Sequence, residues 1–417
     1  MTASIDATVL AALSAEPLDW RYKGLPHEWW GRTASQICAA APNPFTDGAV
    51  GPLCTLKASA LDHNLATMAA WCRERGVALA PHGKTHMSPQ LFARQAEAGA
   101  CAVTVATISQ VRTYRAFGAS PVILANELVD VAGLRWLAFE LDSHEGFEFT
   151  CWVDSVRGVD LMTTALVAAG ARRPVDVCVE LGMAGGRTGC RTEADVDEVA
   201  RAVAASDRLR LVGVAGYEAA LGHQVGPDAY ARVREYLVEL RAAVLRLAPL
   251  FETDAIVVTA GGSTYFDAVA DVLCGEWPAQ LSVRTVLRSG CYLTHDDGLY
   301  ERTSPLSGPN GLRPALTVWA QVMSRPESDL ALLTMGRRDV SFDQDLPVPY
   351  GLPDSTVTKL NDQHAFLRLG TGDADRAEIG SWIEFGCSHP CTVFDKWQLI
   401  PVLDDDLRVV DLVRTFF

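Results

Sequence analysis

The sequence predicts an α/β fold, a TIM-type (β/α)8 barrel, followed by a mostly β C-terminal domain. Eight short apolar runs alternate with helical stretches between residues 77 and 287, and the runs are continuously apolar. Parallel strands that are buried on both faces have this pattern, and eight such units fit a barrel. Near residue 300 this alternation of apolar runs and helical stretches ends, and short strand-like runs between Pro, Gly and Asp turns follow. A doubly wound sheet has the same periodicity and stays open as the competing architecture.

The composition is that of a soluble globular protein. The 417 residues favour two domains over one. The net charge of −15, without any basic run, argues against nucleic acid or an anionic membrane as a partner. There is no apolar stretch of transmembrane length and no basic n-region of a signal peptide. Because the eleven cysteines are scattered without framework spacing, we expect a cytoplasmic protein with reduced thiols.

Three segments are expected along the chain. Residues 1–50 are irregular and rich in Trp and Pro, and we expect them to pack on the β domain. Residues 51–300 should form the barrel and residues 301–417 the β-rich domain. The expected barrel strands are 77–80, 102–105, 122–125, 149–153, 175–181, 210–215, 255–259 and 283–287. The expected helices are 89–98, 110–117, 159–169, 192–205, 228–248 and 265–274.

The first candidate site residue is Lys84, which lies between His82 and His86 just after the apolar run 77–80. Ser88 and Pro89 then resemble the N-cap and first-turn proline of a helix. Loops at the C-terminal ends of strands carry the chemistry in α/β folds, and a lysine there is a Schiff-base candidate. A solvated loop lysine is the alternative, and this segment alone favours it.

Three further loops follow expected barrel strands. In the Gly-rich loop 180–189, Arg187 offers a rigid fork for an oxygen acceptor, and a flexible surface loop is the equal alternative. Tyr217 can stack on a flat ligand, although core packing explains it as well. Arg288, after the last expected strand, can reach a ligand or lie at the surface.

The loop that contains Gly261, Gly262 and Ser263 is the best local signal. Glycines, a hydroxyl and a helix N-terminus together make an anion site from backbone N–H groups. Barrel enzymes commonly bind phosphate after a late strand. The alternative is an ordinary strand-to-helix turn, and the loop lacks the Gly-Lys-Ser/Thr of a Walker motif.

The β domain contributes His389 and Cys391, in Gly386-Cys387-Ser388-His389-Pro390-Cys391. In an extended segment, positions i and i+2 point the same way, so these two side chains could hold one ion. Imidazole and thiolate favour zinc over magnesium or calcium. A buried cysteine beside a structural histidine is the alternative.

These motifs, in this order, resemble the D-serine dehydratase and D-threonine aldolase family. The family consists of fold-type III pyridoxal-phosphate enzymes that are related to alanine racemase. The resemblance runs from about residue 50 to the C-terminus, and it is carried by Pro81-His82-Gly83-Lys84-Thr85-His86, Arg187, Tyr217, Gly261-Gly262-Ser263-Thr264-Tyr265 and Ser388-His389-Pro390-Cys391.

The resemblance implies a pyridoxal-phosphate-binding barrel with a β domain, usually in a homodimer. It implies that Lys84 binds the cofactor covalently, with His82 among the cofactor-binding residues. Arg187 matches the arginine beside the phenolic oxygen, and Tyr217 matches the residue against the pyridine ring. By comparison with alanine racemase, Arg288 falls at the pyridine nitrogen.

The same resemblance assigns the phosphate to Gly261, Gly262 and Ser263. It matches His389 and Cys391 to the metal ligands of the dehydratases, with Zn²⁺ or another divalent ion bound. Because the aldolases carry Asp at the second ligand, Cys391 favours the dehydratases.

The expected function is therefore that of a lyase. A cofactor- and metal-dependent dehydratase would convert a β-hydroxy D-amino acid such as D-serine into an oxo acid and ammonia. The alternative is a D-threonine-type aldolase that yields glycine and an aldehyde. A racemase and a non-catalytic protein that binds pyridoxal phosphate stay open as further alternatives.

Overall fold

The computed structural model describes residues 2–417, which form two compact units. The first unit contains residues 2–5, 69–84 and 95–290, and the second contains residues 6–68, 85–94 and 291–417. Each unit is built around one β-sheet. The predicted three-segment division stays a prediction.

The first unit is built on eight parallel strands, all of which the sequence predicted. They follow one another around the sheet in the order β2-β9-β8-β7-β6-β5-β4-β3. The strands are β2 (Ala78–Leu79), β3 (Val103–Val105), β4 (Val122–Glu127), β5 (Phe149–Val153), β6 (Val175–Leu181), β7 (Leu209–Gly216), β8 (Ile256–Ala260) and β9 (Val283–Leu287).

The sheet curls until its two end strands meet. The Cys101 N–H donates to the Leu79 carbonyl at 2.7 Å, and the Thr104 N–H donates to the Pro81 carbonyl at 2.9 Å. A parallel bridge also pairs His82 with Thr104. The strand order contains no reversal, which a doubly wound sheet requires. The barrel prediction is thus confirmed and the doubly wound alternative is wrong.

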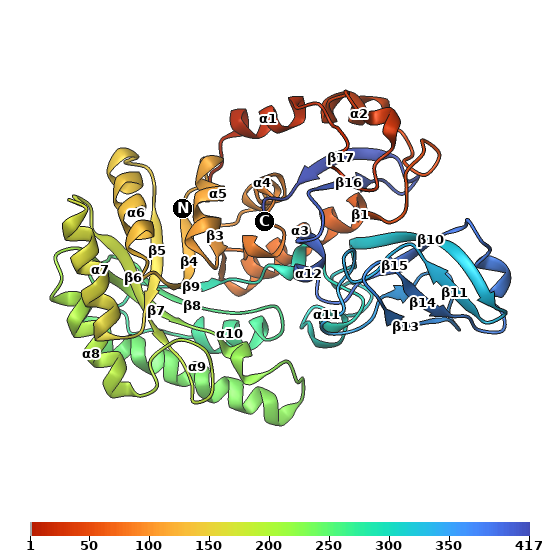
Figure 1. Ribbon diagram of the computed structural model, residues 1–417. Coiled ribbons are helices and arrows are strands. Elements are labelled where there is room, and N and C mark those ends of the chain that lie inside the picture. Colours follow the sequence, from red (N-terminus) through yellow and green to blue (C-terminus); the bar gives the residue numbers. More distant parts are fainter. Residues whose placement is uncertain (1) are drawn as a thin grey trace. The chain divides into compact units, whose positions relative to one another are not determined.

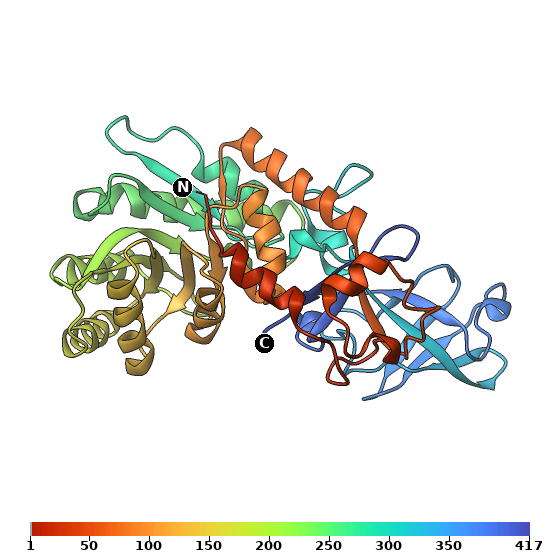
Figure 2. The same ribbon diagram turned by 90° about the horizontal axis from the view of Figure 1, so that it is seen from above.

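Helices lie on the outside of these strands, as Figures 1 and 2 show for α6 to α9. Five expected helices are α5 (Ile108–Ala116), α7 (Val156–Ala168), α8 (Glu193–Ala204), α9 (Pro227–Leu247) and α10 (Phe266–Leu273). The sequence reading missed α6 (Val131–Ser143). Its start signal is Asp130, whose carboxylate accepts the N–H groups of Ala132 and Gly133.

Two of the divisions between the units lie within helices. These helices are α3 (Ala58–Arg75) and α4 (Pro89–Glu97). The Ser88 hydroxyl accepts the Leu91 N–H at 3.4 Å, so the predicted cap before Pro89 is confirmed.

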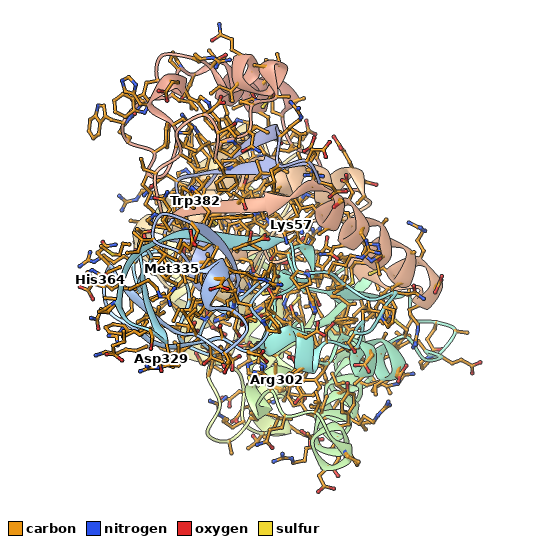
Figure 3. The ribbon with its side chains drawn as sticks, turned by 90° about the vertical axis from the view of Figure 1, so that its right-hand side faces the viewer. Lys57, Arg302, Asp329, Met335, His364 and Trp382 are labelled. Carbon is orange, nitrogen blue, oxygen red and sulfur yellow. The ribbon has the colours of Figure 1, made fainter. Side chains whose placement is uncertain are left out.

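The second unit is built on a nine-stranded sheet. Its main path runs β13-β14-β11-β10-β1-β16-β17, and β15 pairs with both β10 and β12. The strands are β1 (Leu53–Lys57), β10 (Leu316–Glu327), β11 (Leu330–Leu333), β12 (Val348–Pro349), β13 (Thr356–Leu360), β14 (Ala365–Arg368), β15 (Trp382–Gly386), β16 (Leu399–Leu403) and β17 (Val409–Arg414). The predicted strands at 316–322, 331–333, 382–385 and 399–403 are confirmed. Figure 3 labels Lys57 on β1 and Trp382 on β15.

The N-terminal segment is more regular than the sequence indicated. It contains α1 (Ala7–Ala15) and α2 (Ala34–Ala40), and Thr33 and Gln36 form a capping box at the start of α2. Trp29 and Ile37 are fully buried in one core cluster with Leu399 and Leu412 of β16 and β17. The segment therefore completes the hydrophobic core on that side of the second sheet.

Residues 2–417 contain no helix with the length and apolar character needed to cross a membrane.

Candidate active site

Lys84 lies on a single 3-10 turn, Gly83–Thr85, directly after β2. Tyr114 donates its hydroxyl to the Gly83 carbonyl at 3.0 Å, and a Cβ on Gly83 would lie 2.5 Å from that hydroxyl oxygen. The turn is therefore held against the barrel wall. The half-buried amine of Lys84 makes no hydrogen bond or ion pair with residues 2–417. It is available to an incoming carbonyl compound.

His82 lies beside three cations. Burial lowers the pKa of His82 well below its ordinary value, and the positive charges of Lys84, Arg288 and Arg187 lower it further. Its Nδ1 is buried and has no hydrogen-bond partner among residues 2–417. A neutral imidazole with an unused buried nitrogen is consistent with a polar ligand at this position.

Arg187 lies over the ring of Tyr217, with its Cζ 4.4 Å from the ring centroid. This brings two of the predicted site residues together from the ends of β6 and β7. The loop that carries Arg187 is held by Arg191, whose Nη1 donates to the carbonyls of Gly189 at 2.6 Å and Thr188 at 3.0 Å. The sequence reading missed Arg191 because its partners are backbone carbonyls.

The expected phosphate loop already has an anion. The Glu218 carboxylate, fully buried, accepts the N–H of Gly261 at 2.9 Å and the N–H of Gly262 at 2.8 Å. Gly261 has a φ of +97°, which favours glycine. A phosphate here would have to use other donors, and Ser263 makes no hydrogen bond with the described residues. Glu218 directly follows Tyr217 in the sequence, but no local pattern indicated that its carboxylate would hold this loop.

Arg288 is buried and its terminal nitrogens have protein acceptors. Nη1 donates to the Thr259 hydroxyl at 2.6 Å, and Nη2 donates to the Gly216 carbonyl at 2.7 Å. Burial lowers its pKa, against the opposing charges of Glu218 and Glu180. Arg288 thus joins the ends of β7 and β8, and the surface alternative for it is wrong.

Two acidic side chains lie near the C-terminal ends of barrel strands, Glu127 on β4 and Glu180 on β6. Both carboxyl oxygens of Glu127 and one carboxyl oxygen of Glu180 are buried without a hydrogen-bond partner among residues 2–417. Burial, and then the charges of Glu180 and Asp154, raise the pKa of Glu127 to about 8. Glu127 is therefore protonated at neutral pH. The sequence reading assigned neither residue a role.

In the second unit, His389 is held by a carboxylate. Its Nδ1 lies 2.5 Å from Oδ2 of Asp343, and Thr392 donates to the other oxygen at 2.7 Å. Burial favours the neutral acid, but the hydrogen bonds from Thr392 and His389 prevail and lower the pKa of Asp343. The imidazole Nε2 is left for another ligand.

The predicted extended geometry of this segment is wrong. His389 has a φ of 59°, and Cys391 begins the short helix α12 (Cys391–Phe394). A left-handed residue and a following helical Pro390 break the two-residue alternation on which the prediction rested. Residues 2–417 contain no group of three His, Cys, Asp or Glu side chains arranged to hold one ion.

The loop around His389 is organised by carboxylates that the sequence reading missed. Asp296 accepts the His389 N–H at 2.8 Å and the Tyr300 N–H at 2.8 Å. Asp345 accepts the Ser388 hydroxyl at 2.8 Å. The contacts of Asp296 with His389 and of Asp345 with Ser388 span 93 and 43 positions of the chain, so no local pattern could indicate them.

Cys391 contacts two other side chains of its unit. Its Sγ lies 3.4 Å from the Thr85 hydroxyl and 3.5 Å from Sγ of Cys291. A thiolate there has a hydroxyl donor close by.

The residues fit the two groups that the fold family implies. Pyridoxal phosphate needs an available lysine amine and unused polar groups beside it, and Lys84 and the orphaned Nδ1 of His82 supply both. A divalent metal needs an oriented imidazole and a soft second donor, which His389 on Asp343 and Cys391 supply.

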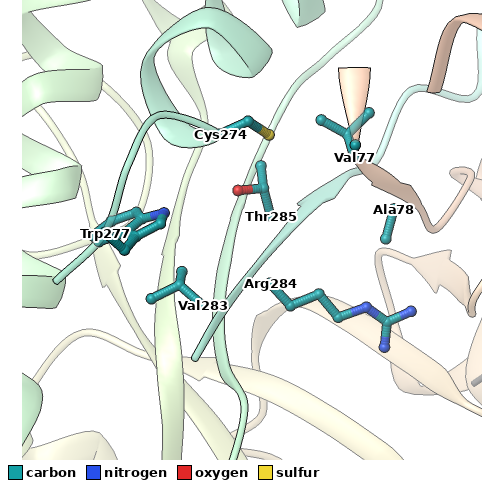
Figure 4. A pocket seen from close by; sticks show the side chains of 8 residues that line it. Val77, Ala78, Cys274, Trp277, Val283, Arg284 and Thr285 are labelled. Carbon is teal, nitrogen blue, oxygen red and sulfur yellow. The ribbon is translucent and has the colours of Figure 1, made fainter. Parts of the chain in front are cut away.

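A cavity of about 390 Å³ lies at the opposite end of the barrel, where the strands begin (Figure 4). It is lined by Val77 and Ala78 at the start of β2, by Val283 and Arg284 at the start of β9, and by Trp277. Lys84 and Gly261 follow the C-terminal ends of strands, so this cavity is separate from the candidate site.

Two family models match this chain, one over its N-terminal part and one over its C-terminal part. A family model for the alanine racemase N-terminal domain matches residues 56–270, which is more than half of the chain. A second, described as a putative serine dehydratase domain, matches residues 315–403.

Similar individual proteins cover most of the chain. A D-threonine aldolase from Arthrobacter sp. is 27% identical over 85% of this chain and 89% of its own. The crystal structure of D-threonine aldolase from Filomicrobium marinum has a TM-score of 0.75 and 26% identity, over 88% of this chain and 95% of that one. D-threo-3-hydroxyaspartate dehydratase from Delftia sp. HT23 has a TM-score of 0.70 and 21% identity, over 88% and 97%.

The barrel, the β unit and both matched domains lead to one conclusion: the chain belongs to the D-serine dehydratase and D-threonine aldolase family of fold-type III pyridoxal-phosphate enzymes.

Proposed function

We propose that this protein is a pyridoxal-phosphate-dependent lyase that dehydrates and deaminates a β-hydroxy D-amino acid, with D-serine as the simplest substrate. The products would be an oxo acid and ammonia, and a divalent metal would assist. The observation that carries the proposal is the Asp343–His389 hydrogen bond of 2.5 Å next to Cys391, in a chain whose Lys84 amine has no hydrogen-bond or ion-pair partner among residues 2–417. A homodimer is part of the proposal.

Lys84 would hold the cofactor and then move a proton. Bound pyridoxal phosphate supplies a conjugated ring that withdraws electrons from Cα of the substrate. With substrate bound, Nζ of Lys84 would take the Cα proton, because no carboxylate among residues 2–417 pairs with this amine. The neighbouring His82 stays neutral, so it can accept a hydrogen bond without adding charge.

Two residues would orient the ring. Arg187 offers a fork to an anionic oxygen, and Tyr217 presents a flat surface beside it. Arg191 supports the proposal because it holds the Arg187 loop by its carbonyls. Ser263 would bind the phosphate, beside the glycine loop whose Gly261 and Gly262 N–H groups Glu218 already accepts.

His389 and Cys391 would hold the metal. A bound divalent ion is a Lewis acid that eases the departure of hydroxide, which is a poor leaving group. Asp343 would fix the imidazole so that Nε2 faces the ion, and the thiolate of Cys391 favours zinc.

A D-threonine-type aldolase is the second candidate, and the 27% identical D-threonine aldolase favours it. In that reaction the substrate hydroxyl loses its proton and the Cα–Cβ bond breaks. A racemase would leave His389 and Cys391 without a task, which argues against it.

The test measures the products of both reactions at once. Purified protein loaded with pyridoxal phosphate and Zn²⁺ is given D-serine, D-threonine and their L-isomers, and oxo acid, ammonia, glycine and aldehyde are assayed. We expect oxo acid and ammonia from the D-isomers, with loss in His389→Ala and retention in His364→Ala, a half-buried histidine of the same unit (Figure 3). Glycine and aldehyde without oxo acid would establish the aldolase instead.

A further inference from the structure

The thiol of Cys391 has a second cysteine beside it. Cys291 lies at the start of the 3-10 turn Cys291–Leu293, and its Sγ is 3.5 Å from Sγ of Cys391. The two residues are 100 positions apart in the chain, so the fold, not the local sequence, brings them together. Neither cysteine is part of a disulfide in the structure.

The two cysteines lie against the same buried cluster of side chains. Cys291 is 5% exposed and packs in one apolar cluster with Leu299 and Tyr300, against which the partly buried Cys391 also lies. The buried Thr85 hydroxyl is 3.4 Å from one sulfur and 3.8 Å from the other. The two sulfurs therefore share one hydroxyl neighbour.

A disulfide needs the sulfurs to approach to about 2.05 Å, which is a further ~1.5 Å from their present separation. Rotation about the two Cα–Cβ bonds can supply such a shift, since Cys391 is partly exposed.

We propose that Cys291 and Cys391 form a reversible disulfide, so that a small oxidant such as hydrogen peroxide switches the metal ligand off. The Cys391 sulfur, the more exposed of the two, attacks the peroxide; the O–O bond breaks and sulfenic acid and water result. The Cys291 sulfur then displaces the second oxygen as water and forms the S–S bond. Two thiols are oxidised, one peroxide is reduced to two waters, and a dithiol reverses the change.

The consequence for metal binding rests on the proposed function, whereas the disulfide itself does not. A sulfur in a disulfide is no longer a thiolate donor, so the oxidised protein keeps only His389 of the proposed pair. We expect metal affinity to fall by more than the about 10- to 100-fold that loss of an outer-shell partner costs.

The experiment maps the disulfide and measures metal separately. Reduced full-length protein is treated with hydrogen peroxide, its free thiols are counted after denaturation, and its peptides are mapped by mass. We expect two of the eleven thiols to be lost as one cross-linked pair of peptides containing Cys291 and Cys391. Cys291→Ser should abolish the cross-link, and Cys274→Ser, at another partly buried cysteine, should leave it intact.

The outcomes separate this proposal from the function on which part of it rests. A cross-link with loss of bound Zn²⁺, both reversed by dithiothreitol, supports the switch. Thiol loss in wild-type protein without that cross-linked pair overturns it and leaves the metal assignment standing. A cross-link with unchanged Zn²⁺ binding removes Cys391 from the metal site, and with it the metal part of the proposed function.

Discussion

Nδ1 of His389 lies 2.5 Å from Oδ2 of Asp343, in the loop between β11 and β12. Asp343 is anchored from its other oxygen by Thr392, so the imidazole is held by a carboxylate that is itself fixed. This arrangement selects the tautomer with its proton on Nδ1 and presents Nε2 as a metal donor. The relationship gives the metal proposal a test that does not alter either proposed ligand.

Asp343→Asn should weaken metal binding by about 10- to 100-fold, because the amide orients the imidazole less strongly than the carboxylate. Equilibrium dialysis against Zn²⁺ measures the change. Asp329→Asn is the matched control, since Asp329 is an exposed residue of the same unit that pairs with Arg368. Equal affinities for the two variants would contradict the role of Asp343.

Glu127 should make stability depend on pH. Its folded-state pKa of about 8 lies above the ordinary value of 4.5, so the folded protein holds a proton that the unfolded chain releases. The contribution of Glu127 to the free energy of unfolding is therefore greatest below pH 4.5. It falls as the pH rises from 4.5 to about 8. Glu127→Gln, which keeps the shape without the charge, should be more stable than wild type above pH 8 by roughly 1–3 kcal/mol.

Urea unfolding at pH 6 and pH 9 checks the Glu127 prediction. The advantage of Glu127→Gln should grow between the two values, whereas exposed Glu145→Gln should show no such growth. An advantage that is the same at both values would contradict the buried, protonated carboxyl.

Glu218→Gln should destabilise the barrel by about 1–3 kcal/mol. Its carboxylate accepts two N–H groups, from Gly261 and Gly262, and an amide can accept only with its oxygen while its NH₂ faces the second donor. Thermal unfolding compares this variant with Glu239→Gln, at an exposed position on α9. Equal unfolding temperatures would show that the loop does not depend on this acceptor.

Gly83→Ala should disturb the lysine turn. The added Cβ would lie 2.5 Å from the Tyr114 oxygen and 2.8 Å from a methyl of Val103, so roughly 1–3 kcal/mol of stability should be lost. Gly146→Ala, where nothing lies within 4 Å of the new Cβ, is the control. Denaturant unfolding of both variants decides whether this glycine is required by packing.

The barrel was predictable because its strands are a local signal. Each is a continuous apolar run, and the loop after β2 carries its Lys84 in a recognisable motif. The helix α6 was missed, although Asp130 caps its N-terminus. In the second unit β1 pairs with β10 and β16, which are more than 250 residues away, and no local pattern reports such pairing.

The candidate site was predictable in its motif residues and not in their partners. Lys84, His389 and Cys391 stand in short motifs that the sequence shows directly. Asp343 and Cys291 act through contacts across 46 and 100 positions, which only the fold creates. The extended geometry expected at Cys391 failed for a local reason, the left-handed backbone of the preceding histidine.

The most direct test of the proposed function identifies the lysine to which pyridoxal phosphate binds. Protein loaded with pyridoxal phosphate is reduced with borohydride, which fixes the linkage to lysine, and its peptides are mapped by mass. The chain offers the lysines Lys23, Lys57, Lys84, Lys359 and Lys396. We expect the label on Lys84, and we expect Lys84→Ala to lose both the label and the yellow colour. Label on another lysine, or a colourless protein that cannot be loaded, would contradict the proposed function.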